Sequence, residues 1–304
     1  MDSWKRNKAV FFILSLPATV WLVAFFVVPL GFVWVLSFGE KVGIIGIEIT
    51  WTLDNYGRAL DPLYLGIVWQ SMWIAGLTTA ICLVVGFPVA MAISFAPGRW
   101  KAILLLLVIL PFWTNLLIRT YALIAVLRTR GYVNASLEWL WEGGREVLGL
   151  VGLAWVLGER FEPLELLYSH AAVVYGLVYV HLPFMVLPLY AALERLDKSY
   201  IEASLDLGAG QWRTFFAVTV PMAMPGIVSG VIITFIPALG SFLTPTLLGG
   251  PDSQMIGNII ERQFKAANDW PFGAALSFLL MYVTFGALAL RAAYAARGRG
   301  LAEA

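Results

Sequence analysis

The chain has 304 residues, of which 60% are hydrophobic and only 13% are charged, and its formal net charge is +1. Soluble domains carry about 25% charged residues, and no soluble core of this size could hide so many apolar side chains. A soluble globular protein is therefore excluded, and the composition indicates a polytopic membrane protein. Cys82 is the single cysteine, so an intrachain disulfide is excluded as well.

The first apolar run extends from Ala9 to Phe38 and follows a short basic stretch. A signal peptide has an apolar core of only about 7–15 residues, so we interpret this run as an uncleaved first span. A polar, turn-rich loop follows, and the run from Leu65 to Phe95 is the predicted second span.

Four further apolar runs predict the remaining spans. They cover residues 102–127, 171–193, 222–248 and 271–292. The polar loop 128–169 contains the apolar stretch 147–157, which is about half of a spanning length. We expect an interfacial or partly buried outer helix there, because a seventh span would invert everything that follows it.

The basic residues predict which side each loop faces, since the cytoplasmic loops of membrane proteins carry an excess of Lys and Arg. With the N-terminus inside, the inner segments hold eleven basic and six acidic residues, and the outer loops hold eight basic and thirteen acidic residues. The sequence thus predicts an all-α membrane protein with six transmembrane helices, both termini in the cytoplasm and an acidic outer face.

A patterned polar segment, residues 199–221, lies on the inner side in this topology. Ser199 and Glu202 have the spacing of a capping box, in which each side chain bonds a free backbone N–H at a helix start. Gly208 and Gly210 can supply the left-handed turn that ends such a helix. Caps and glycines of this kind occur in any surface helix-turn-helix, so they do not by themselves indicate a function.

The spacing within this segment is more specific. Glu202-Ala203-Ser204, three residues, Gly208, nine residues and Val218-x-Val220-Pro221 resemble the EAA loop of ABC-importer permeases. There, Glu-Ala-Ala, Gly and a terminal Ile-x-Leu-Pro stand at the same intervals. Serine replaces the third alanine here, and valines replace Ile and Leu. The resemblance implies a cytoplasmic loop that docks into a cleft on an ATPase subunit through Ser199, Glu202, Ala203, Ser204, Gly208 and Pro221.

The chain contains no Gly-x-x-x-x-Gly-Lys-[Ser/Thr] sequence, so it cannot hold ATP phosphates as a P-loop does. We therefore expect no catalytic residue, no metal and no cofactor on this chain, with ATP and Mg on a partner ATPase. An intramembrane hydrolase would need a nucleophile and a base at membrane depth. Ser229, Ser241, Thr244 and His181 qualify by residue type alone, but serines in spans commonly bond backbone carbonyls.

Arg119 is the one clear charge inside a predicted span. Such a residue is costly in lipid and is a functional candidate, although it could also lie near the outer end of its span and extend to the interface. His181 and Asn115 are better explained as interhelical hydrogen bonders than as ligand contacts.

Four stretches extend the resemblance: PFWTNLLIRTYAL (111–123), YGLVYVHLPFMVLPLY (175–190), LDKSYIEASLDLGA (196–209) and NDWPFGAA (268–275). Each is similar to the spermidine/putrescine-type permease subunit, and the similarity runs from about residue 65 to 292. The stretch 142–162 departs from the shorter outer loop of that family. The resemblance implies three parts: 1–64 with the first helix and outer loop, a type I ABC transmembrane domain at 65–292 with the coupling loop 194–221, and a cytoplasmic tail at 293–304.

The family further implies a multi-pass permease subunit of an ATP-driven importer in the bacterial inner membrane. It would pair with a second permease subunit, two ATPase subunits and an external substrate-binding protein, and would bind no nucleic acid. A polyamine suits the acidic outer face and cation–π contacts with aromatic residues. Opines, phosphonates, ferric ion, sulfate or amino-acid-like solutes remain open, as does an ATPase-independent channel. The candidate path residues are Trp113, Asn115, Arg119, Tyr175, Tyr179, His181, Ser241 and Thr244.

Overall fold

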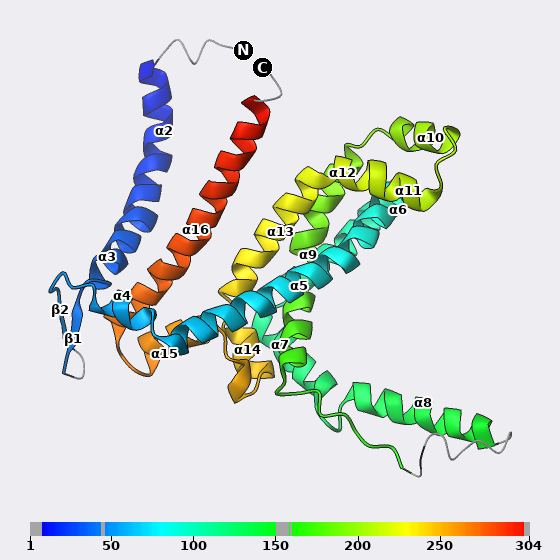
Figure 1. Cartoon of the computed structure of the whole chain (residues 1–304), viewed down its shortest axis with the longest axis horizontal. Helices are drawn as coiled ribbons and strands as arrows, with labels where there is room; N and C mark the ends of the chain where they lie inside the picture. Colours follow the sequence, from blue (N-terminus) through cyan, green and yellow to red (C-terminus); the bar gives the residue numbers. More distant parts are fainter. Residues whose placement is uncertain (1–7, 44–45, 150–157, 159, 301–304) are drawn as a thin grey trace. The chain divides into compact units, whose positions relative to one another are not determined.

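The computed structural model describes residues 8–43, 46–149, 158 and 160–300, and most of these residues are helical (Figure 1). The chain divides into two compact units. Residues 1–65 and 259–304 make the first unit, and residues 66–258 make the second.

In the first unit, the first predicted span is a nearly continuous helix made of α2 (Lys8–Leu22), the π-helical turn η1 (Val23–Val27) and α3 (Val28–Leu36). The π-turn lies just before Pro29, which has no N–H to donate to the carbonyl four residues earlier. Large apolar side chains are exposed all around this helix, for example Phe12 at 66% and Trp21 at 67%. A helix that is apolar on every side and uncovered by protein is suited to lipid contact.

The loop after α3 is anchored to the start of the last helix, α16 (Trp270–Gly300). It forms the antiparallel strands β1 (Glu40–Val42) and β2 (Gly46–Glu48) and the short helix α4 (Asp54–Ala59). Arg58 on α4 forms an ion pair with Asp269 at 3.2 Å. Its guanidinium carbon also lies 4.1 Å from the ring centre of Phe272, which is fully buried.

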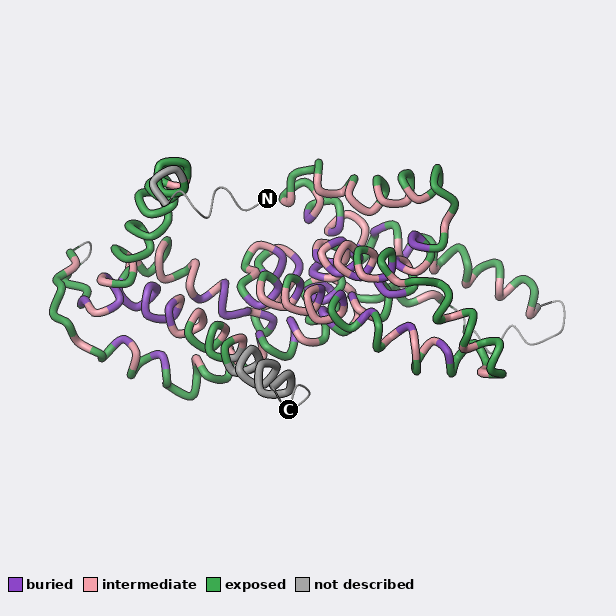
Figure 2. The backbone as a smooth tube through the Cα atoms, turned by 90° about the horizontal axis from the view of Figure 1, so that it is seen from above, coloured by how far each residue is buried: buried purple, intermediate pink, exposed green. Residues whose placement is uncertain are grey.

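In the second unit, α9 (His170–Glu194) packs closely against α13 (Met224–Leu239), and α5 (Pro62–Phe95) contributes to the same core. Figure 2 shows the buried residues concentrated where these helices meet. The core residues are Cys82, Phe87, Ala90, Ile93, Met185, Val186, Leu189, Leu193 and Ala223. Small residues allow the close approach: a Cβ on Gly226 would lie 2.5 Å from the Cβ of Ala192 and 2.7 Å from the carbonyl oxygen of Pro188.

The predicted span 102–127 is interrupted by a break in the helix. The helix α6 (Gly98–Ile109) gives way to a 3-10 turn, η2 (Leu110–Trp113), and a separate helix α7 (Leu116–Leu127) follows. The chain turns by 96° between residues 98–113 and 116–148. Thr114 and Asn115 adopt extended backbone conformations, which end the helix after the turn that contains Pro111.

The predicted span 222–248 is also interrupted. Three short helical segments, α11 (Gln211–Thr214), η4 (Phe215–Thr219) and α12 (Val220–Met222), lead into α13 at an angle of 67°. Helix α13 ends at Leu239, and after a break α14 (Leu243–Leu248) follows. The next polar segment, predicted as a loop, contains η5 (Pro251–Ser253) and α15 (Ile256–Lys265).

The long loop 128–169 contains the helix α8 (Tyr132–Gly149). Helix α8 starts well before the short outer helix predicted from the apolar stretch 147–157. Residues 150–157 of that stretch lie outside the described part of the chain. By length and composition, three described helices could cross a membrane: 11–36, 62–95 and 170–194. The two bent pairs could bring this to five, and 270–286 is a shorter apolar helix. The six-span count, the side of each terminus and the division into three parts remain predictions.

The contact at Gly226 predicts a position-specific loss of stability. Gly226→Ala should destabilise the protein by about 1–3 kcal/mol, because the new methyl group overpacks the interface between α9 and α13. Thermal unfolding of the detergent-solubilised protein measures the effect. The control is Gly76→Ala in α5, where nothing lies within 4 Å of the added carbon and the change should be neutral or slightly stabilising. Equal melting temperatures for both variants would contradict the tight contact.

Candidate coupling loop and transport path

The coupling segment begins with the helix α10 (Ser199–Asp206), whose start differs from the predicted capping box. The backbone N–H of Ser199 donates to Oδ1 of Asp197 at 3.0 Å, and no side chain caps the helix at Lys198. This hydrogen bond from Ser199 lowers the pKa of the Asp197 carboxyl. The capping-box prediction for Ser199 and Glu202 is wrong because Asp197, two residues before the helix, takes the first N–H.

The two glycines after α10 adopt different conformations. Gly208 has φ +84°, in the left-handed region, and its N–H donates to the carbonyl of Leu205 at 2.9 Å. Gly210 has φ −67° and begins α11 instead. The predicted left-handed turn is therefore confirmed for Gly208 and wrong for Gly210. Only Gly208 needs the absence of a Cβ for its backbone conformation.

The helices α10 and α11 form a hairpin that one contact holds together and another attaches to the body of the unit. The hydroxyl groups of Ser204 and Thr214 lie 3.0 Å apart, which joins α10 to α11. The ring of Phe215 packs edge-on against Phe87 of α5, with 5.3 Å between the ring centres. Since Phe87 belongs to the buried core, Phe215 attaches the segment after α11 to the core of the unit.

A second connection lies where α9 ends and the coupling segment begins. The Lys101 ammonium contacts both carboxylate oxygens of Glu194, at 2.7 Å and 2.8 Å. The hydroxyl of Ser94 donates to the same carboxylate at 3.4 Å. Glu194 thus links the ends of α5, α6 and α9 at the entry to the loop.

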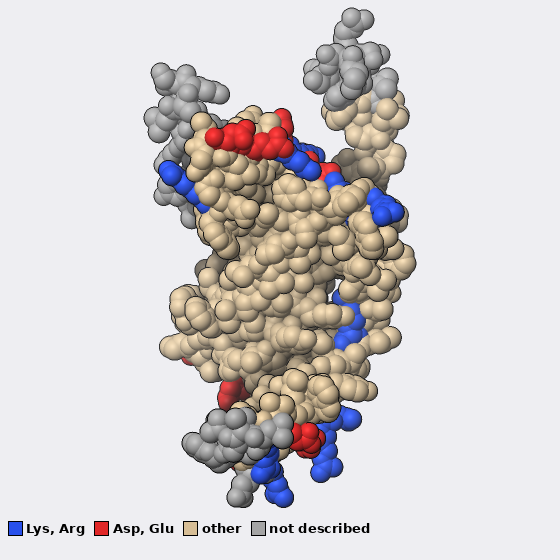
Figure 3. Space-filling model, turned by 90° about the vertical axis from the view of Figure 1, so that its right-hand side faces the viewer, with Lys and Arg blue, Asp and Glu red and all other residues tan. Residues whose placement is uncertain are grey.

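The outer surface of the hairpin combines exposed apolar residues with acidic residues. Leu207 is 89% exposed, Trp212 77% and Phe216 64%, and the rings of Trp212 and Phe216 are stacked. Glu202, Ala203 and Pro221 are exposed too. Figure 3 shows that Lys, Arg, Asp and Glu gather at the two ends of this face of the second unit and are sparse between them. Sequence reasoning missed Leu207; the signal was an apolar residue directly before a glycine that ends a helix.

The candidate path residues near the break in span three act mainly within their own segments. Trp113 is 76% exposed. Asn115 caps α7, where its side-chain oxygen accepts the N–H of Leu117 at 2.8 Å. In α9, Nδ1 of the buried His181 lies 2.9 Å from the carbonyl oxygen of Leu177 and donates to it. Each of these bonds joins the side chain to the backbone of its own helix, and interhelical hydrogen bonds of Asn115 and His181 remain predictions.

Arg119 is partly buried in the first turn of α7. Its guanidinium carbon lies 5.9 Å from the ring centre of Phe112, and its Nε atom is buried without a hydrogen-bond partner among the described residues. No Asp or Glu occurs in the helical stretches 62–95, 98–127 and 224–248. A positive charge that forms no ion pair within the described part of the chain remains a functional candidate.

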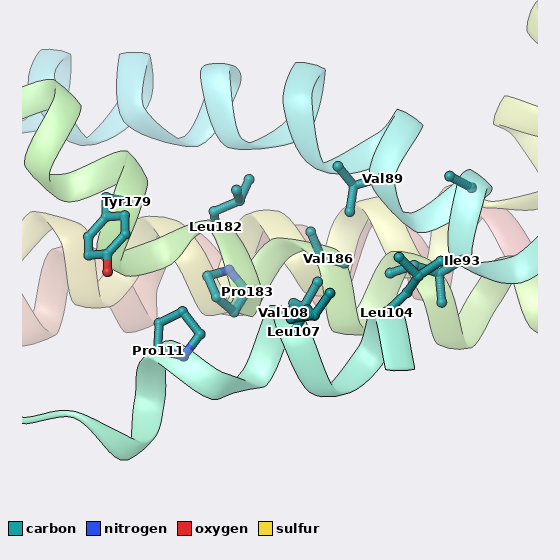
Figure 4. Close-up of a pocket in the computed structure, with 11 residues that line it drawn as sticks. Val89, Ile93, Leu104, Leu107, Val108, Pro111, Tyr179, Leu182, Pro183 and Val186 are labelled. Carbon is teal, nitrogen blue, oxygen red and sulfur yellow. The ribbon is translucent and has the colours of Figure 1, made fainter. Parts of the chain in front are cut away.

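The remaining candidates do not meet in one place. Tyr179 lines an apolar groove of about 420 Å³ between α5, α6 and α9, where it lies at the same end as Pro111 and Pro183 (Figure 4). Tyr175 lines a second groove, of about 770 Å³, together with Gln70 and His170. Thr244 is fully buried, and Ser241 lies in the break between α13 and α14. Within the described residues, the structure brings no group of these side chains into a single binding site.

The broken apolar helices and the exposed hairpin between α9 and α13 define a multi-pass membrane permease of the ABC-importer type. Solved structures support this fold. An alginate ABC importer matches with a TM-score of 0.69 at 18% identity and covers 97% of this chain and 98% of its own. A second structure, an alginate ABC transporter in complex with an alginate-bound periplasmic protein, matches with a TM-score of 0.66 at 16% identity and covers 94% of both chains.

The chain belongs to the family of binding-protein-dependent transport system inner membrane components, whose model matches residues 147–299. It is 41% identical over 263 residues to the spermidine/putrescine transport system permease protein PotB of Escherichia coli. This alignment covers 86% of this chain and 90% of that protein. It is 38% identical over 257 residues to PotB of Haemophilus influenzae, with 84% of each chain covered. The protein is accordingly a multi-pass permease of the inner membrane.

The contact at Asp197 predicts how the start of α10 responds to mutation and pH. Asp197→Ala should speed amide hydrogen exchange in the first turn of α10, because the Ser199 N–H loses its acceptor. Since the pKa of Asp197 is lowered, its contribution is complete above the ordinary carboxyl pKa and is lost as pH falls through the lowered value. Exchange mass spectrometry at neutral pH provides the measurement. Asp206→Ala at the far end of α10 is the control; equal protection in both variants would contradict the cap.

Proposed function

We propose that this chain is the permease subunit of an ATP-driven importer for polyamines of the spermidine and putrescine type. The similarity to polyamine permeases over most of the chain carries the proposal. The acidic residues of the predicted outer loops support it, because they raise the local concentration of a polycation. Described helices of the second unit carry exposed aromatic residues, such as Tyr175 at 51%, that offer cation–π contacts to an ammonium group.

The chain contributes half of the translocation path in this proposal. A second, different permease subunit completes the path, two ATPase subunits bind on the cytoplasmic side, and an external binding protein delivers the solute. ATP and Mg bind to the ATPase subunits and no cofactor binds to this chain. The absence of a P-loop sequence supports the placement of ATP hydrolysis on a partner.

The hairpin of α10 and α11 is the proposed handle for the ATPase. Its exposed Leu207 and Trp212 provide an apolar contact surface, and the acidic Glu202 fixes its orientation. ATP-driven closure of the ATPase pair moves the hairpin, and the contact of Phe215 with Phe87 carries this movement to α5. Nucleotide then biases two conformations of the spans that differ in the side on which the path is open.

The substrate is tested by uptake into proteoliposomes that contain the complete transporter. We expect ATP-dependent accumulation of radiolabelled spermidine or putrescine, and competition by other polyamines. A binding screen on the external receptor serves as an independent measurement. Binding and uptake of an opine, a phosphonate or another anionic solute in place of polyamines would overturn the substrate, and flux through this chain alone without nucleotide would overturn the importer.

The coupling role is tested at the two glycines of the hairpin. Gly208→Val should abolish uptake, because a β-branched residue at φ +84° is strained and the hairpin loses its shape. Gly210→Val is the matched control, since φ −67° suits any residue and nothing lies within 4 Å of an added Cβ.

Both glycine variants should insert into the membrane in equal amounts, which immunoblotting of membrane fractions checks. The Gly208 variant should also stimulate ATP hydrolysis less when substrate and binding protein are added. Normal uptake by Gly208→Val would contradict the role of the hairpin in coupling.

A further inference from the structure

The first turn of helix α8 (Tyr132–Gly149) is attached to the chain near the last residue of α7 and the first residue of α9. It begins five residues after Leu127, the last residue of α7. The side-chain amide of Asn134 donates to the carbonyls of Thr129 at 3.0 Å and Leu164 at 2.9 Å, and its oxygen accepts the N–H of Leu164. Leu164 lies six residues before α9 begins. Asn134 is almost fully buried, so this attachment fixes the first turn of α8 at the ends of α7 and α9.

The direction of α8 differs from that of the spanning helices. Helix α8 is separated from α7 by residues 128–131, which are not helical, so it need not follow the direction of α7. In Figure 1, α8 extends sideways from the end of α9 rather than along it. A helix that starts at the end of a span and runs across its direction lies along the membrane surface rather than through it.

The surface of α8 is divided into three faces. One face is covered: Val133, Leu137, Trp141 and Leu148 are partly buried, and the ring of Trp141 lies 6.3 Å from that of Phe161. The acidic face holds Glu138, Glu142 and Glu146, which are four residues apart and all exposed.

The third face is apolar, and the residues that the structure describes leave it uncovered. Tyr132 is 73% exposed, Trp139 72%, Val147 63% and the flanking Leu140 60%. Tyr132, Trp139 and Val147 recur at intervals of seven and eight residues, with the small residues Ser136 and Gly143 between them, so they form one stripe along the helix. Exposed apolar surface of this extent on one helix face marks a place where another medium or molecule is bound.

We propose that this stripe of α8 lies in the interfacial layer of the bilayer, with the acidic face turned to water. Tyr and Trp favour the interfacial layer because their rings are apolar and their polar atoms stay hydrated. Leu140 and Val147 reach toward the acyl chains. Glu138, Glu142 and Glu146 stay in contact with water, because burying a carboxyl group without a partner costs free energy. The apolar stripe continues the lipid-contacting surface of the protein from the end of α7 outward.

Two other occupants are possible for the same stripe: the external binding protein, and other protein segments, which include residues 150–157 of this chain. The bilayer is favoured by the attachment of α8 at the span ends, which keeps the stripe at membrane level. A surface that binds a soluble partner would not have to lie at the height of the membrane.

The test uses nitroxide spin labels on single cysteines in the complete transporter, reconstituted in phosphatidylethanolamine–phosphatidylglycerol liposomes. Cys82, the single native cysteine, is fully buried, so Cys82→Ala gives the background. Labels are placed at Leu140→Cys and Val147→Cys on the apolar face and at Glu142→Cys and Glu146→Cys on the acidic face. Ser136→Cys is a further site on the apolar stripe, where the change in size is small if the other variants do not fold. Collision rates with oxygen, which concentrates in lipid, and with a water-soluble nickel chelate are measured.

We expect oxygen collisions to exceed nickel collisions at positions 136, 140 and 147, and the reverse at 142 and 146. Higher nickel accessibility at all five positions would overturn the proposal, since the stripe would then lie in water. Low accessibility to both reagents at 140 and 147 would also overturn it, because protein would cover the stripe. If nickel accessibility at 140 falls only after the binding protein is added, the stripe is a docking surface for that protein. None of these results depends on the transported solute, so they test α8 separately from the proposed function.

Discussion

The absence of water inside a bilayer requires every backbone N–H and C=O in the spans to find a partner within the protein, and the interrupted helices of this chain meet that requirement with their own side chains. At the break after α6, Thr114 donates to the carbonyl of Pro111 at 2.8 Å and Asn115 accepts the N–H of Leu117. At the break after α13, Asn258 donates to the carbonyl of Phe242 at 2.9 Å and to the hydroxyl of Thr246 at 2.6 Å. The breaks are therefore built into the fold with dedicated polar side chains, and they give the helices on either side separate directions.

The small hairpin of α10 and α11 is connected to several of these separately directed helices. The α10–α11 hairpin is attached to α5 through Phe215 and Phe87, and the preceding helix end is attached to α6 through Glu194 and Lys101. Helix α13, which follows the hairpin, lies against α9 with no room for a side chain at Gly226. Packed interfaces of this kind resist continuous deformation, so the proposed displacement of the hairpin would move whole helices rather than bend them.

Much of this fold follows from the sequence, and the parts that do not have identifiable physical reasons. The apolar runs located α5 and α9 to within three residues at each end, since length and hydropathy decide whether a helix can cross a membrane. The breaks at 110–115 and 240–242 were missed because Pro, Gly, Ser and Thr at those positions lower the hydropathy of a long run only slightly. Gly208 was identified by its place after a helix, whereas the role of Asp197 depends on local geometry that competes with the capping box. The transport path could not be predicted from the sequence, because residue type does not show that Tyr175 and Tyr179 face separate grooves.

Arg119 places a positively charged guanidinium group in the first turn of α7. In the predicted topology Arg119 lies in span three, where its charge is subject to the electrical field across the membrane. A unit charge that crosses the whole membrane changes energy by about 2.3 kcal/mol per 100 mV, and a partial movement by a proportional share. With the cell interior negative, the voltage favours whichever conformation carries Arg119 closer to the cytoplasm. The resting potential and the nucleotide would then act on the same conformational balance.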